Sequence, residues 1–87
     1  MVLEDAERGD DRIDINIGKR LRSRRRHMGL TQTELASRIG VRFQQIQKYE
    51  CAANRVSAAR LWRLSTVLEV AASYFYEGLD VTGADAS

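Results

Sequence analysis

The stretch from Gln32 to Tyr49 constrains the fold of this chain more than any other. Gly40 divides it into two short segments, each with apolar residues at helical spacing. Glycine has no Cβ and therefore readily adopts the left-handed conformation that ends many helices. The pattern predicts two short helices joined by a tight turn, and the second of them runs from Phe43 to Glu50. The residues expected to face inward are Leu35, Ala36, Ile39, Val41, Ile46 and Tyr49.

Two signals mark the start of the first helix. Thr31 and Glu34 have the spacing of a capping box, in which the hydroxyl and the carboxylate accept two backbone N–H groups that the helix leaves unpaired. Leu30 and Leu35 occupy the two positions of a hydrophobic staple. Both signals predict that the helix begins directly after Thr31.

The outward face of the second helix carries side chains suited to reading DNA. It presents Phe43, Gln44, Gln47 and Lys48. Glutamine and lysine can hydrogen-bond to base edges in a major groove, whereas phenylalanine can only pack, for instance against a thymine methyl. A helix pair alone does not identify a DNA reader. The helix lengths, the Gly-Val turn and the apolar pattern together favour one.

Charge is strongly segregated along the chain. Residues 1–15 carry a net charge of −4, residues 16–63 a net charge of +10, and the last 24 residues a net charge of −4. The densest basic run extends from Lys19 to Arg26. A basic middle between acidic ends is expected of a polyanion-binding surface, whereas a merely solvated helix face would normally mix the two signs.

One pattern covers most of the chain. It comprises Gly29 to Gln32, Leu35, Ala36, Gly40, Val41, Gln44 to Glu50, Asn54 to Ser57, Leu61, Leu64, Leu68 to Val70 and Phe75. In these residues the chain, from Ile17 to Leu79, resembles the Cro and phage-repressor type of helix-turn-helix transcription regulators, especially the short members found in alphaproteobacteria. One departure is Ala52, which stands where the family usually has glycine. In a left-handed position alanine would cost on the order of 1 kcal/mol.

The resemblance implies an all-α, five-helix bundle of the lambda repressor-like kind over residues 13–79. It implies a sequence-specific regulator of double-stranded DNA whose recognition helix, residues 43–50, lies in the major groove. Phe43, Gln44 and Lys48 would face the bases, with Gln47 on the adjoining face. A homodimer is expected, because one recognition helix covers only a few base pairs. Phosphate contacts are expected from Gln32, Arg42, Asn54, Arg55, Ser57, Arg20 and Arg24.

The resemblance also assigns a partner to Arg25. In this family an arginine at that position pairs with the glutamate that ends the recognition helix, here Glu50. A partly buried pair can fix the angle between two helices even when it adds little net stability. The alternative is that Arg25 reaches solvent or a phosphate.

The residue pattern at the N-terminus predicts a tail followed by a helix. Residues 1–12 are polar and acidic, which favours a disordered tail. The helix would begin near Asp14, with Asp14 or Asn16 as its N-cap. A short strand is the alternative, because Ile13, Ile15 and Ile17 alternate.

The C-terminal half predicts two further helices, residues 58–68 after Ser57 as N-cap and residues 72–77, followed by a flexible tail at residues 80–87. Trp62 falls outside the inner stripe and could pack against the N-terminal segment or a partner. Tyr74 and Tyr76 are either a dimer contact or ordinary partly exposed side chains. The inward residues are expected to be Leu61, Leu64, Leu68, Phe75 and Leu79.

Other functional classes lack the residues that they need. His27 is the only histidine and Cys51 the only cysteine, so no zinc-ligand spacing exists. No nucleophile has a plausible base, and no glycine-rich phosphate loop is present, so we expect neither enzyme activity nor a cofactor. No apolar run approaches the ~20 residues of a membrane span. A lone cysteine suits a reducing cytosol, so a cytoplasmic protein is expected, nucleoid-associated when bound to DNA.

A protein-interaction module is the competing interpretation. Antitoxins share the fold that the resemblance implies, bind a toxin and regulate their own operon. In this interpretation a toxin would be the protein partner, whereas a transcription regulator could instead contact RNA polymerase. The short acidic ends of the chain are poor candidates for a toxin-binding extension.

Overall fold

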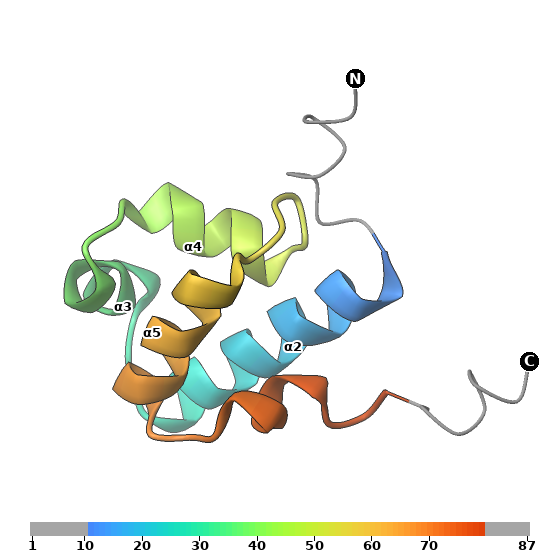
Figure 1. The fold of residues 1–87 in the computed structure, drawn as a ribbon. Coiled ribbons are helices and arrows are strands. Elements are labelled where there is room, and N and C mark those ends of the chain that lie inside the picture. The colour runs from blue at the N-terminus through green and yellow to red at the C-terminus, as the bar shows by residue number, and fades with distance from the viewer. Residues whose placement is uncertain (1–10, 80–87) are drawn as a thin grey trace, which may run out of the picture.

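A computed structural model describes residues 11–79 as an all-α arrangement (Figure 1). The predicted fold class is confirmed, with one difference: the last of the five predicted helices is a short 3-10 helix. Of the tails predicted at residues 1–12 and 80–87, only residues 11 and 12 are described. None of the described helices is both long and apolar enough to span a bilayer. The elements are α2 (Arg12–His27), α3 (Gln32–Ile39), α4 (Phe43–Glu50), α5 (Ala58–Leu68) and the 3-10 helix η1 (Ala72–Tyr76).

The turn between α3 and α4 follows the local signals in the sequence. The Thr31 hydroxyl accepts the Glu34 N–H at 3.0 Å, and the Glu34 carboxylate accepts the Thr31 N–H at 2.8 Å, so the capping box is formed. The hydrogen bonds from Thr31 lower the pKa of the Glu34 carboxyl. Gly40 ends α3 in the left-handed conformation, with φ 76°. The Val41 N–H then bonds back to the Ala36 carbonyl, which closes the turn.

The start of α2 differs from both predicted caps. The N-cap is Asp11, whose carboxylate accepts the Asp14 N–H at 3.0 Å. Helix α2 therefore begins two residues before Asp14, and the strand alternative is wrong. Asp14 is buried inside the first turn. Asn16, the other predicted cap, lies further along α2 and donates to the carbonyls of Phe75 and Glu77.

The core lies where all the described helices meet. The predicted inward faces of α3, α4 and α5 are confirmed, and Leu79 is half-buried rather than buried. Val41 and Met28 are partly buried against the core. Its buried residues are Ile17, Leu21, Leu30, Leu35, Ala36, Ile39, Ile46, Tyr49, Leu61, Leu64, Leu68 and Phe75.

Gly18 lies where α2 packs tightly against the end of α4. A Cβ built on Gly18 would lie 2.6 Å from the Tyr49 carbonyl oxygen and 2.7 Å from that of Glu50. Both atoms belong to the backbone, so neither can rotate away. Nothing in the local pattern of α2 marks this glycine, because the contact joins residues about 30 positions apart in the sequence. The sequence analysis therefore missed it.

A row of polar side chains on α2 binds backbone carbonyls of the chain from Leu68 to Glu77, which we call the C-terminal segment. Asn16, Arg20 and Arg24 are spaced by four residues and therefore share one face of the helix. Arg20 Nε donates to the Tyr74 carbonyl at 3.0 Å, and Arg24 Nε donates to the Leu68 carbonyl at 2.9 Å. The Arg20 guanidinium also lies 3.8 Å from the centroid of the Tyr74 ring. Figure 1 shows η1 and α4 on opposite sides of the molecule, with α2 between them.

Ala52 adopts the left-handed backbone conformation, at the position where the family usually has glycine. Its φ is 61°, and it follows Cys51 at the end of α4. The next two N–H groups, of Ala53 and Asn54, both bond back to the Lys48 carbonyl. The loop geometry of a helix stop is thus formed in spite of the alanine.

We expect Ala52→Gly to raise the free energy of unfolding by about 0.5–1 kcal/mol, because it relieves the strain of a side chain at positive φ. Urea unfolding measures the change. Ala53→Gly is the matched control: Ala53 has no positive φ, so that change should lower stability slightly. An equal response to both changes would show that the backbone at position 52 stores no strain.

Candidate nucleic-acid interface

The outward face of α4 carries the four predicted base-reading residues. Ile46 and Tyr49 are buried, so the opposite side of this two-turn helix points to solvent. Phe43 is 41% exposed. Within the described residues, the side chains of Gln44, Gln47 and Lys48 are exposed and make no hydrogen bond or ion pair. Their donors and acceptors are therefore available to an external ligand.

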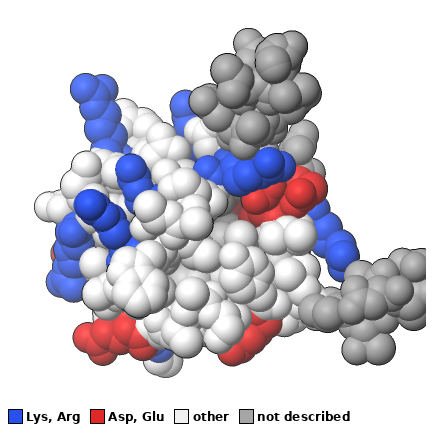
Figure 2. Space-filling model, viewed as in Figure 1, with Lys and Arg blue, Asp and Glu red and all other residues white. Residues whose placement is uncertain are grey.

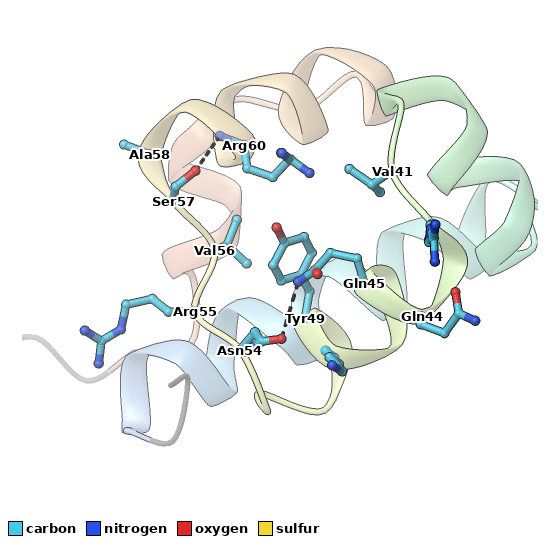
Figure 3. Close-up of a pocket in the computed structure, with 12 residues that line it drawn as sticks. Val41, Gln44, Gln45, Tyr49, Asn54, Arg55, Val56, Ser57, Ala58 and Arg60 are labelled. Atoms are coloured by element: carbon cyan, nitrogen blue, oxygen red, sulfur yellow. Dashed lines mark hydrogen bonds between the residues drawn. The ribbon is translucent and has the colours of Figure 1, made fainter. Parts of the chain in front are cut away.

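An open groove separates α4 from the start of α5 (Figure 3). Its volume is about 980 Å³, and Tyr49 stands between the two helices. Ser57 caps α5: its hydroxyl accepts the Arg60 N–H at 3.1 Å, as predicted. Among the residues that the structure describes, no acidic residue lines the groove. The lining residues are Val41, Arg42, Gln44, Gln45, Lys48, Tyr49, Asn54, Arg55, Val56, Ser57, Ala58 and Arg60.

The charge distribution on the surface agrees with the segregation along the sequence. Figure 2 shows Lys and Arg side chains spread over the part of this face that carries α3 and α4, whereas Asp and Glu gather along the lower edge and in a further patch at the upper right, beside the start of α2. Within the described residues, Arg42, Lys48 and Arg60 form no ion pair. These cations retain their capacity to bind an external anion.

A buried ion pair fixes α4 against α2. Arg25 Nε lies 2.6 Å from Glu50 Oε2, and the two side chains are only 10% and 4% exposed. Arg25 also donates to the other carboxylate oxygen at 3.1 Å and to the Leu30 carbonyl at 2.8 Å. The predicted pairing of Arg25 with Glu50 is therefore present, and the solvent alternative is wrong.

The same carboxylate holds the side chain of Gln32. Gln32 Nε2 donates to Glu50 Oε1 at 3.0 Å, so the glutamine side chain has a protein partner. The backbone N–H of Gln32 is the first of α3 and has no intrahelical acceptor. A phosphate could therefore meet Gln32 through this backbone N–H, whereas the side chain is already bound to Glu50.

Arg55, predicted to contact phosphate, has carboxylate partners instead. Its Nε lies 3.1 Å from Asp14 Oδ2, and its terminal nitrogen lies 3.7 Å from Asp11 Oδ2. Figure 3 shows its side chain pointing away from the groove, over the start of α2. We call this cluster of Asp11, Asp14 and Arg55 the acidic clasp. Burial raises the pKa of the Asp14 carboxyl, although the hydrogen bond from Arg55 opposes that shift.

The remaining predicted phosphate contacts divide into two groups. Arg42 and Ser57 border the groove, as does Asn54, whose side chain accepts a hydrogen bond of 3.5 Å from Gln45. Arg20 and Arg24 lie elsewhere, bound to carbonyls of the C-terminal segment. Their positions give them no common surface with α4. Arg60, which the sequence analysis did not select, lines the groove because of its position one turn into α5.

A family profile described as helix-turn-helix matches residues 21–75, which contain α3, the turn and α4. The chain belongs to this helix-turn-helix family. An uncharacterised HTH-type transcriptional regulator from Sinorhizobium fredii is 51% identical over 67 residues, which cover 77% of this chain and 47% of the relative. The resemblance to alphaproteobacterial regulators is thus confirmed. The helix-turn-helix chain spans about half the length of the curated relatives that it matches.

Solved helix-turn-helix structures share the fold. The restriction-modification controller protein C.AhdI from Aeromonas hydrophila is similar with a TM-score of 0.67 at 28% identity, covering 70% of this chain and 92% of that one. The P22 c2 repressor in complex with a synthetic operator also has a TM-score of 0.67, at 27% identity, covering 72% and 96%. The second of these proteins was solved bound to its operator DNA.

Proposed function

We propose that this domain is a sequence-specific transcription regulator that binds double-stranded DNA with α4 in the major groove. The observation that carries the proposal is the outward face of α4, where exposed glutamine and lysine side chains, without partners among residues 11–79, lie beside a groove lined by cations. Membership of the helix-turn-helix family and the likeness to an operator-bound repressor support the same conclusion. The buried Arg25–Glu50 pair supplies the rigid support that a reading helix needs.

Each residue on the reading face has a distinct chemical role in this proposal. Gln44 can donate and accept at once, which matches the N6 and N7 edge of adenine. Lys48 can donate to O6 or N7 of guanine, and Phe43 can pack against a thymine methyl. Gln47 lies on the adjoining face and reads an outer base or a bridging water.

Phosphate contacts would flank this helix on both sides. Arg42 stands directly before α4, and Arg60 and Asn54 lie across the groove. The N-termini of α3 and α5, at Gln32 and Ser57, add backbone N–H groups and the positive ends of helix dipoles. We further propose a homodimer on DNA with half-sites about one helical turn, roughly 34 Å, apart. Selection of bound duplexes from random sequence should then return two-fold symmetric sites.

Gln44→Ala tests the reading role. On the selected site we expect it to weaken binding by about 1–3 kcal/mol, and by much less on a site altered at the base that Gln44 reads. Arg42→Ala is the matched control, because Arg42 is proposed to contact only phosphate. Removing this cation should weaken binding to all DNA sequences alike and reduce the slope of log affinity against log salt by roughly one unit.

The measurement is binding of both variants to a panel of single-base operator changes at several salt concentrations. Circular dichroism should show unchanged helix content, since both side chains are exposed. An equal loss across the panel for Gln44→Ala would mean that α4 does not read bases in the proposed orientation.

A further inference from the structure

Arg55 differs from the other cations of the groove because it is already bound to acid. The acidic clasp places two carboxylates against one guanidinium, so these three side chains together carry a net charge of −1. Arg42, Lys48 and Arg60 have no such partner within the described residues. The clasp therefore removes one cation from the groove and adds one excess negative charge at its edge.

The two carboxylates are carried by the start of α2, whereas Arg55 is carried by the loop between α4 and α5. Asp11 is the N-cap of α2, and its other oxygen accepts the Asp14 N–H at 3.0 Å. The Asp14 side chain is 7% exposed and sits in the first turn of the helix, where the helix dipole favours negative charge. Arg55 is 40% exposed at the end of a long flexible side chain, so it is the member that can move.

We propose that Asp11 and Asp14 act as an internal competitor for DNA phosphate, holding Arg55 away from the backbone and limiting the sequence-independent part of DNA binding. The inference rests on the proposed function. Non-specific affinity is almost entirely a matter of cations meeting phosphates, so each cation withheld lowers that affinity and flattens its dependence on salt. A carboxylate that merely oriented Arg55 toward a phosphate would have the opposite effect on binding when removed.

The test uses the full chain and a short duplex of mixed sequence, with binding followed by fluorescence anisotropy at several salt concentrations. Asp14→Asn and Asp11→Asn should each tighten binding, by about three- to tenfold at low salt, and steepen the salt slope by up to roughly 0.9. Asn caps a helix as well as Asp does, so Asp11→Asn tests the clasp without disturbing the fold. Glu77→Gln is the matched control, because it removes an acid paired with Arg20 on the far side of α2 and should leave binding unchanged.

Arg55→Gln separates the clasp from a general effect of charge. In that background Asp14→Asn should gain much less than it gains in the wild-type chain, because no cation remains to be released. Unchanged or weaker binding by both asparagine variants would overturn the inference, as would equal gains with and without Arg55. Provided that the wild-type protein binds the duplex, those results would overturn only the inference about the acidic clasp and leave the proposed function standing. A wild-type protein that binds no duplex would defeat the proposed function, and the inference with it.

Discussion

Glu50→Ala should lower the free energy of unfolding by about 3–5 kcal/mol, the loss typical of a buried charge left without its partner. The Arg25 guanidinium would retain only its hydrogen bond to the Leu30 carbonyl, and Gln32 would lose its acceptor as well. A small domain is stable by only about 5–15 kcal/mol in total, so this change threatens the fold itself. Urea unfolding at neutral pH measures the loss.

A double-mutant cycle measures the interaction energy between Arg25 and Glu50 separately from the other losses. Arg25→Ala combined with Glu50→Ala should recover part of the stability, because neither charge is then buried alone. The exposed pair of Arg20 and Glu77 is the matched control. It has the same 2.6 Å separation, but its side chains are 28% and 63% exposed, so the coupling energy from the same cycle should be no more than about 1 kcal/mol. Strictly additive losses for Arg25 and Glu50 would mean that the two groups do not interact.

Gly18→Ala should destabilise the domain toward the upper end of ~1–3 kcal/mol, although alanine is the better helix former. The added Cβ would meet the carbonyl oxygens of Tyr49 and Glu50 at 2.6 and 2.7 Å, so α2 and α4 must move apart. That movement would also disturb the buried ion pair just beyond the contact. The melting temperature should fall by roughly 4–8 °C for each kcal/mol lost.

Ser23→Ala supplies the reference for this change. Ser23 is exposed on the same helix, so alanine there should be neutral or slightly stabilising. A Gly18→Ala variant that melts with or above the Ser23→Ala variant would show that the two helices can separate at little cost. Urea unfolding of both variants measures the difference between their free energies of unfolding.

The elements that could be predicted are those whose signals are local. The capping box at Thr31 and Glu34, the glycine stop at position 40 and the inward stripe of α5 each lie within one turn of the residues they organise, and the structure contains all three. The pairing of Arg25 with Glu50 is not local. It was accessible only through the family resemblance, because no spacing rule links residues 25 positions apart.

The contacts that escaped prediction depend on tertiary geometry. Asp14 resembled an N-cap by type, but Asp11 takes that role and leaves Asp14 buried beside Arg55. Arg55 was assigned to a phosphate because its loop borders the reading helix, whereas the fold brings the start of α2 within reach of its guanidinium. Gly18 gave no signal at all, since its importance lies in the backbone of another helix.

The attachment of the C-terminal segment has a consequence for how this surface can vary. Asn16, Arg20 and Arg24 hold the segment by its carbonyl groups, which every residue possesses whatever its side chain. In η1, Phe75 is fully buried and the Tyr74 ring lies against the Arg20 guanidinium, so the exposed side chains of Ser73 and Tyr76 are the ones not needed to anchor the backbone. We therefore expect the outer side chains of η1 to diverge freely among relatives. One helix-turn-helix scaffold could in this way present many different surfaces on the side of η1 without changing the outward face of α4.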